Sequence, residues 1–122
     1  MKYGEQEIKN AKLELWPNPE PKRRYTVKIE FPEFTCLCPR SGYPDFATIK
    51  LEYQPAKHIV ELRSLKLWLN SFRDRHISHE AAANAIYSEI EKKAKPRALR
   101  VEAEFSVRGG AKTTIIVGST KS

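Results

Sequence analysis

The sequence predicts an α+β domain in which two helices cover one face of a four-stranded antiparallel sheet. Three observations support this fold class: segments of alternating apolar and polar residues in both halves of the chain, two amphipathic segments between them, and a Gly109-Gly110 pair. Alternation with a period of two is typical of half-buried strands, and an apolar stripe with a period near 3.6 is typical of surface helices. Because 122 residues are enough for one core without disulfides, we treat 1–122 as a single domain.

The first two strands are expected over 25–31, YTVKIEF, and over 47–53, ATIKLEY, where apolar residues alternate with Thr, Lys and Glu. The connection between them, Pro32 to Phe46, has fifteen residues, which is too many for a simple hairpin. Connections of that length are often functional. Residues 1–24, with prolines at 17, 19 and 21, are expected to form an irregular arm.

Two helices are expected over 61–72 and 80–94, and Pro96 ends the second. Two further strands follow over 98–107 and 113–117, with the glycine pair forming the turn between them. The residues expected to face the core are Leu62, Leu65, Leu69 and Phe72 in the first helix, Ala83, Ile86, Ile90 and Ala94 in the second, and Leu99, Val101, Ala103, Phe105 and Val107 in the third strand.

The charge balance is basic, with 22 Lys and Arg against 15 Asp and Glu and a net charge of +7. Such a surface attracts phosphate, which can belong to a nucleic acid or to a small cofactor. The outward positions of the first two strands are Thr, Lys and Glu and offer no aromatic ring for base stacking. No apolar run approaches the length of a membrane span and the amino terminus lacks a secretory signal, so we expect a cytoplasmic protein without a membrane partner.

Both cysteines lie in the stretch FTCLCPRSGYPD, residues 34–45. A C-x-C pair in a reducing cytosol is not expected to form a structural disulfide, which leaves catalysis, metal binding or packing. Zinc needs three or four ligands, and the chain has no C-x-x-C or H-x-x-x-H pair, so we expect no metal. Gly42 and Pro44 could turn the chain so that Asp45 approaches Cys38, and a thiol beside an acid can add to an electrophilic carbon. Packed thiols and a Cys-His pair with His76 or His79 remain open.

The runs LCPRSGYPDFATI (37–49), VELRSLKLWLNSFRDRHISHE (60–80) and FSVRGG (105–110) resemble, in this order, motifs of the short NADPH-dependent 7-cyano-7-deazaguanine reductases, the nitrile reductases of queuosine biosynthesis. The resemblance covers nearly all of 26–118. It implies the tunnelling fold, in which several subunits join their sheets into a barrel, as a ring or two stacked rings. It also implies a four-electron reduction of the nitrile to an amine with two NADPH, on a small-molecule substrate and without direct nucleic-acid contact.

The resemblance implies a role for each matched residue. Cys38 would be the nucleophile that forms a covalent thioimide, and Asp45 the proton donor, whereas Cys36 falls where the family needs no thiol. Arg63 stands where the family motif usually has lysine, which changes the hydrogen-bond geometry of that cofactor contact. The implied substrate contacts are Val60, Glu61, Leu62, His79 and Glu80, with Glu80 on the guanine-like edge, and the implied cofactor contacts are Arg63, Ser64, Lys66 and Arg73.

Several alternatives remain open at this point. Glu80 also suits the first turn of a helix by its charge alone, and the polar stripe of Arg63, Lys66, Asn70 and Arg73 could be a solvated face. Arg40 is the cation nearest in sequence to the Cys38 thiol and could favour its ionisation. Two other functions compete with the reductase: an amidine-forming relative that adds ammonia to a nitrile on transfer RNA, and a basic nucleic-acid-binding module.

Overall fold

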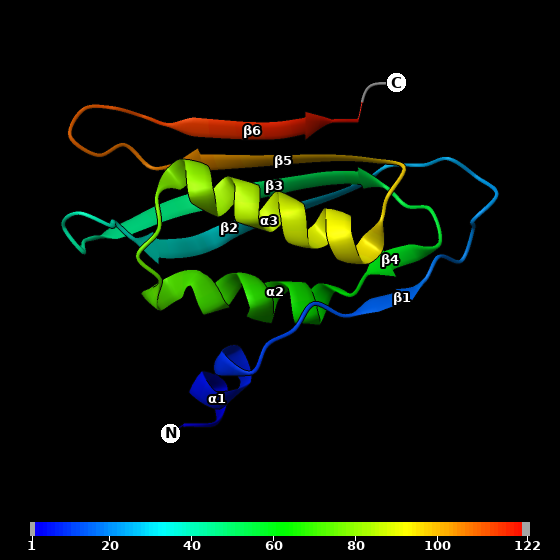
Figure 1. The fold of residues 1–122 in the computed structure, drawn as a ribbon, viewed down its shortest axis with the longest axis horizontal. Coiled ribbons are helices and arrows are strands. Elements are labelled where there is room, and N and C mark those ends of the chain that lie inside the picture. Colours follow the sequence, from blue (N-terminus) through cyan, green and yellow to red (C-terminus); the bar gives the residue numbers. More distant parts are fainter. Residues whose placement is uncertain (1, 121–122) are drawn as a thin grey trace.

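The structure is a computed structural model that describes residues 2–120, and its centre is a four-stranded antiparallel sheet with the strand order β2-β3-β5-β6. The strands are β2 (Val27–Leu37), β3 (Pro44–Gln54), β5 (Ala98–Phe105) and β6 (Thr114–Ser119). Figure 1 shows α2 (Leu62–Asn70), the short 3-10 helix η1 (Ser71–Asp74) and α3 (His79–Ala94) on one side of this sheet. The predicted α+β class with an antiparallel sheet is confirmed.

The amino-terminal residues are more regular than predicted. They form α1 (Tyr3–Lys9) and β1 (Leu15–Pro17), and β1 pairs antiparallel with β4 (His58–Val60). The prediction of an irregular arm over 1–24 is therefore wrong for these two elements. β1 forms because a distant segment pairs with it, with Trp16 opposite Ile59. The sequence near β1 consists of a few residues among prolines and does not indicate this partner.

The prediction of a fifteen-residue connection between the first two strands is also wrong. Both strands continue until Leu37 lies opposite Pro44, so that only residues 38–43 connect them. The pairing shifts between Phe31, opposite Ile49, and Phe34, opposite Ala47. This β-bulge accommodates Pro32, which has no N–H to donate to the ladder.

The core lies between the sheet and the helices. The apolar stripe of α3 is buried as predicted, and Ser78 caps the helix by accepting a hydrogen bond from Ala81 N at 3.1 Å. Two predicted core positions are corrected: Leu62 is 54 % exposed because it is the first residue of α2, and Val107 is 64 % exposed because β5 ends at Phe105. The other predicted core residues are buried, namely Leu65, Leu69, Phe72, Ala83, Ile86, Ile90, Ala94, Leu99, Val101, Ala103 and Phe105.

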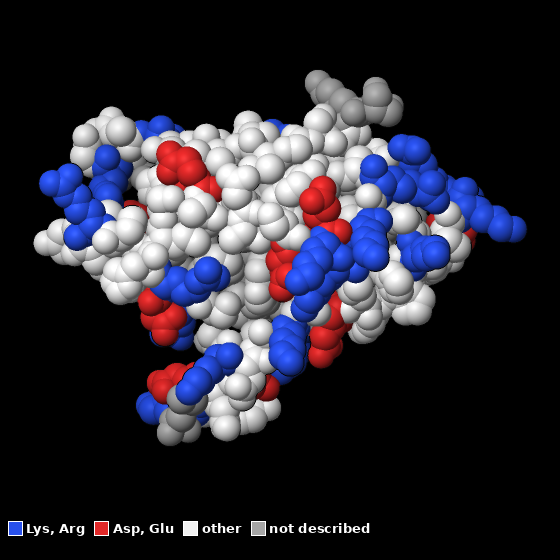
Figure 2. Space-filling view, viewed as in Figure 1, with Lys and Arg blue, Asp and Glu red and all other residues white. Residues whose placement is uncertain are grey.

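One end of the sheet brings together three segments that are far apart in the sequence. The β2–β3 connection, the β5–β6 connection and the beginning of α3 lie at the same end of the molecule (Figure 1). Figure 2 shows Lys and Arg side chains at this end and a larger group at the opposite end, near β1 and β4. Across residues 2–120, every helix is too short or too polar to pass through a lipid bilayer.

Candidate active site

Cys38 is the first residue after β2 and lies at the mouth of a tight loop. Its N–H donates to Tyr43 O at 2.8 Å, and its carbonyl accepts from Gly42 N at 2.9 Å. Gly42 has φ of 76°, a conformation that glycine adopts without a steric penalty. These contacts fix the Cys38 side chain at the end of the strand, where the residue is 9 % exposed.

Arg108 contacts both Cys38 and Asp45. It comes from the β5–β6 connection, and its Nη1 lies 2.6 Å from Asp45 Oδ1 while its Nη2 lies 3.5 Å from Cys38 Sγ. Asp45 is the second residue of β3 and is 5 % exposed, so its charge is paired inside the protein. The predicted proximity of Cys38 and Asp45 is thus achieved through a guanidinium that the sequence reasoning did not assign.

The environment of Cys38 favours its thiolate. Hydrogen bonds from the side chain and backbone of Ser41, then from the Arg108 side chain and the Arg40 backbone, lower the pKa of Cys38 to about 6. Arg40 therefore contributes its amide, whereas the suggestion that its guanidinium is the activating cation is not supported by any contact of that side chain within residues 2–120. At neutral pH most of the Cys38 side chain is the nucleophilic form.

Cys36 has the opposite environment. It is fully buried opposite Asp45 in the β2–β3 ladder, and its Sγ lies 4.0 Å from Ile77 O. Burial, followed by the negative charge of Asp45, raises the pKa of Cys36 to about 11. This thiol is a packing residue.

His79 completes the cluster around Asp45. It is the first residue of α3, and its Nε2 lies 3.2 Å from Asp45 Oδ2. Its ring stacks on Phe105 with a centroid separation of 3.8 Å and an interplanar angle of 10°. The next residue, Glu80, is exposed, and within residues 2–120 no side chain bonds to its carboxylate.

Three of the predicted substrate contacts lie elsewhere in the chain. Val60 N donates to Tyr53 Oη at 2.9 Å, and Tyr53 stands eight positions after Asp45 on β3, which corresponds to roughly 26 Å along a strand. The Glu61 carboxylate caps α2 by accepting from Arg63 N and Ser64 N at 2.7 and 2.8 Å. A single chain therefore does not bring the segment 60–62 to Cys38.

The four predicted cofactor contacts differ in their availability. Arg63 pairs with Glu7 of α1 at 2.8 Å. Ser64 is buried, and its hydroxyl donates to Glu61 O at 2.8 Å and accepts from Glu14 N at 2.9 Å. Lys66 and Arg73 are exposed and have no ion-pair partner within residues 2–120. Phosphate oxygens suit such unpaired cations, so Lys66 and Arg73 are the donors here that fit a phosphorylated cofactor.

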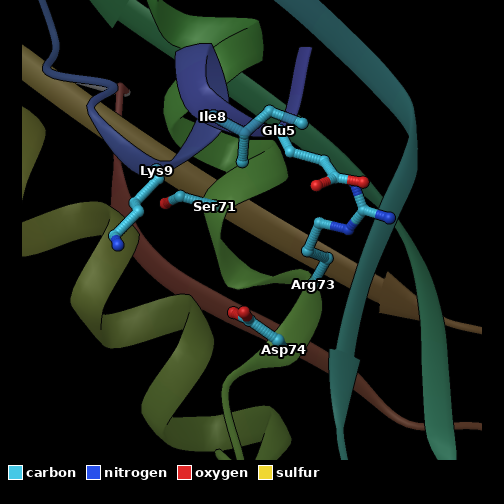
Figure 3. A pocket seen from close by; sticks show the side chains of 6 residues that line it. All are labelled: Glu5, Ile8, Lys9, Ser71, Arg73 and Asp74. Atoms are coloured by element: carbon cyan, nitrogen blue, oxygen red, sulfur yellow. The ribbon is translucent and has the colours of Figure 1, made fainter. Parts of the chain in front are cut away.

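Arg73 also lines an open groove of 640 Å³ between α1 and η1. Figure 3 shows Glu5, Ile8 and Lys9 projecting from α1 and Ser71, Arg73 and Asp74 contributed by η1. Two cations and two acids share this groove, and the groove does not include the Cys38 cluster.

The arrangement is suited to covalent catalysis. An ionised thiol can attack an electrophilic carbon, while the neighbouring Asp45 and His79 can handle the protons of the heteroatom that gains charge. Across residues 2–120, no three side chains of His, Cys, Asp or Glu are grouped so that they could hold a metal ion.

Comparisons with known proteins show what the chain as a whole is similar to. A family profile described as "QueF-like protein" matches residues 44–122. A relative from Aquifex aeolicus, named "NADPH-dependent 7-cyano-7-deazaguanine reductase", is 63 % identical over 118 residues, covering 97 % of this chain and 92 % of the relative. A relative of the same name from Sulfurimonas denitrificans is 53 % identical over 125 residues and covers 99 % of each chain. A crystal structure of "the archaeosine synthase QueF-Like in the apo form" has a similar fold, with a TM-score of 0.69, 21 % identity, and coverage of 81 % of this chain and 95 % of that one.

Proposed function

The chain belongs to the family of NADPH-dependent 7-cyano-7-deazaguanine reductases, and from this premise we propose that it reduces the nitrile of 7-cyano-7-deazaguanine to the primary amine, a step of queuosine biosynthesis. The observation that carries the proposal is the paired geometry of Cys38 and Asp45 on one guanidinium, with Arg108 2.6 Å from the carboxylate and 3.5 Å from the sulfur. A nitrile carbon is the kind of electrophile that an ionised thiol attacks.

Covalent addition makes the nitrile reducible. The Cys38 thiolate forms a bond to the nitrile carbon, and one proton enters on the nitrogen, giving a thioimide. NADPH supplies one hydride to each of two successive acceptors, so that four electrons are delivered in total. After the first, the nitrogen lone pair expels the Cys38 thiolate and leaves an imine, and after the second a further proton on nitrogen gives the amine. The sum is one nitrile, two hydrides and two protons.

Asp45 and His79 are the groups we assign to the proton transfers. Asp45 Oδ2 lies 3.2 Å from His79 Nε2, so a proton can pass between them without a large movement. The Phe105 ring holds the imidazole parallel to itself and keeps Nε2 directed at the carboxylate. We expect this pair to deliver protons to the substrate nitrogen while Arg108 stays bonded to Oδ1.

Glu80 is the residue we assign to the guanine-like edge of the substrate. Its carboxylate is exposed next to His79 and bonds to no other side chain of residues 2–120. A carboxylate can accept together from the ring N–H and the exocyclic amine of such a base. The alternative, in which Glu80 only complements the helix dipole, requires an acid in the first turn of α3 but no bond to the substrate.

Lys66 and Arg73 are the cations we assign to the phosphates of NADPH. Both are exposed on the α2–η1 segment and free of ion pairs within residues 2–120, whereas Arg63 is held by Glu7 and the Ser64 hydroxyl is already bonded. We therefore leave Ser64 out of the cofactor site and expect Arg63 to take part only if Glu7 releases it.

We also propose that the active enzyme is a ring-shaped homo-oligomer with sites shared between subunits. β2 and β6 form the two edges of the sheet, and joining these edges between copies would continue the sheet. Tyr43, Phe46 and Val107 are exposed near Cys38, and Leu62 is exposed at the other end. A neighbouring copy could cover these side chains and supply the segment 60–62 that one chain holds away from its own nucleophile.

One assay tests the function directly. The protein is mixed with 7-cyano-7-deazaguanine and NADPH, and the nicotinamide absorbance is followed while the amine is identified by mass spectrometry. We expect two NADPH to be consumed for each amine formed. Amidine formation from ammonia without NADPH consumption would support the competing function and contradict the reductase. Light scattering on the same sample tests the assembly, because a fully active monomer would refute the shared site.

A further inference from the structure

We propose that Arg108 is the positioning residue of this site: its guanidinium contacts the Cys38 sulfur and the Asp45 carboxylate at the same time and so fixes them side by side before substrate arrives. The role in turnover rests on the proposed function. The effect on the free thiol does not, since it can be measured without nitrile or NADPH.

The first support is the planar geometry of the Arg108 guanidinium. Nη1 and Nη2 belong to one planar group and point in fixed directions, so binding Asp45 Oδ1 at 2.6 Å also sets the direction in which the second amino group meets Cys38 Sγ at 3.5 Å. A lysine ammonium lacks this planar pair of donors. One side chain therefore sets the relative position of two groups that lie on different strands.

The second support is the way in which the β5–β6 connection holds Arg108. Its N–H donates to Ala111 O at 3.1 Å, and its carbonyl accepts from Ala111 N at 3.2 Å. Gly109 and Gly110 between them have φ of 61° and 82°, which glycine adopts without strain. Ser106 N also donates to Phe46 O at 2.8 Å, which fastens the connection to β3 next to Asp45.

The third support is the charge around the sulfur. The ionised Cys38 and Asp45 are two neighbouring anions, and Arg108 lies between them. Each of these contacts raises the pKa of Arg108 further above its usual value. The other titratable or charged groups at this end are Cys36 from β2, Arg40 and Tyr43 from the β2–β3 connection, Arg75 and His76 from the segment that pairs with Leu37, His79 and Glu80 from α3, Glu104 from β5, and Lys112 from the β5–β6 connection.

The Ser41 side chain and backbone, which lower the pKa of Cys38 most, remain when the guanidinium is removed, so the pKa should rise only part of the way because one donor is lost and the Asp45 charge is no longer offset. We expect Arg108→Gln to move the midpoint of thiolate formation upward by about one pH unit. Near pH 6 this corresponds to about a five-fold slower alkylation of Cys38 by iodoacetamide in the free enzyme. Thiolate absorbance at 240 nm across pH gives the same midpoint independently.

Two matched variants distinguish the contact between Arg108 and Cys38 from a general effect of removing a positive charge. Lys112→Gln removes a cation from the same connection, one that pairs with Glu104 at 3.0 Å, and Arg40→Gln removes the cation two residues after Cys38. We expect neither to move the midpoint by more than about 0.3 unit, because exposed charges are well screened. Thermal unfolding of each variant checks that it is folded.

The proposal is overturned if Arg108→Gln leaves the midpoint unchanged, or if Arg40→Gln raises it equally. Should Arg108→Gln fail to fold, Arg108→Lys takes its place. Lysine keeps the positive charge but lacks the planar pair of donors. The covalent nitrile adduct should therefore form more slowly, even though the midpoint of Cys38 thiolate formation moves less. An Arg108→Lys variant equal to the parent in both measurements would contradict the positioning role. If an Arg108 variant lost reductase activity while the midpoint of Cys38 thiolate formation stayed the same, the effect of Arg108 on the thiol would be refuted, and the proposed function of the protein would not.

Discussion

Cys36 lies in β2 and Cys38 is the first residue after it, and although both side chains face the same side of the sheet, the pKa is about 11 for Cys36 and about 6 for Cys38. Cys36 is enclosed by the core and faces the anion Asp45 across the ladder, so ionisation would place a second charge in an apolar space. Cys38 stands where the strand ends, and there Ser41, the Arg40 amide and Arg108 converge on the sulfur. The comparison indicates that the acidity of each thiol depends on burial and on the hydrogen-bond donors around it, and that such donors are available at the end of the strand.

The largest expected effect is the loss of activity when the Cys38 thiol is removed, in contrast to removal of the Cys36 thiol. Cys38→Ala should abolish turnover and the covalent adduct with the nitrile, because the attacking atom is gone. Cys36→Ser should still form the adduct. Mass spectrometry of each protein with 7-cyano-7-deazaguanine and no NADPH decides between the two thiols, and an adduct that persists in Cys38→Ala would refute the assignment.

The second prediction concerns the pH dependence of the two thiols. Because only thiolates react, alkylation of Cys38 should be half-maximal near its pKa of about 6, fall as the pH is lowered through that value, and be constant above it. Near pH 7.5 the thiolate fractions of the two cysteines should differ by roughly three orders of magnitude. Iodoacetamide labelling with fragment mass spectrometry measures both rates in one sample. A Cys38 midpoint near that of an ordinary cysteine, about 8.5, would show that the donors at the end of the strand do not stabilise its thiolate.

The third prediction concerns the acid that lies near both thiols. Asp45→Asn should retain nitrile binding but lower the rate of reduction by about 10²- to 10⁴-fold, because the amide cannot supply a proton to the substrate nitrogen. Binding is measured by titration in the Cys38→Ala background and turnover by NADPH absorbance. Asp74→Asn, a change to an exposed acid in η1, is the matched control. A loss of affinity as large as the loss of rate would indicate that Asp45 holds the base.

The smallest expected effect lies away from both cysteines. Lys66→Ala should weaken NADPH binding by about ten-fold, as expected for one charge-assisted hydrogen bond to a phosphate. Adduct formation at Cys38 should keep its rate, because Lys66 is on α2 and does not contact the thiol. Lys92→Ala, on the exposed side of α3, is the control. Equal losses of cofactor affinity and adduct rate would contradict the separation of the two sites.

Most of the fold could be predicted from the sequence because its periodicities are local. The stripe of α3 and the alternation of β5 each depend on residues within one element, and both were placed within a few residues. The predicted elements are wrong where pairing with residues distant in the sequence determines the structure. Pro32 suggested the end of a strand, but the pairing of Phe34 with Ala47 carries β2 on past the bulge. β1 exists because β4 pairs with it.

The site was predictable in its parts but not in its connections. The stretch around Cys38 and the motif resemblance indicated Cys38, Asp45 and His79, and the structure brings all three to one end of the sheet. Arg108 was present in the quoted FSVRGG run but received no role, because its partners are 63 and 70 residues away in the chain. A basic residue next to two turn glycines, in a run already matched to the family, was the available signal.

The β-bulge of β2 changes which positions of the strand face the helices. Before the bulge the odd-numbered positions 27, 29 and 31 turn towards the helices, and after it the even-numbered positions 34, 36 and 38 do so. The bulge thus reverses the phase of the alternation, and this reversal gives Cys38 the same facing as Asp45. Substitution at Pro32 or Glu33 should leave the phase intact, whereas gaining or losing one residue there should move the Cys38 side chain to the other side of the sheet. If Cys38 is the nucleophile that we propose, the length of this short segment matters to catalysis as much as the thiol does.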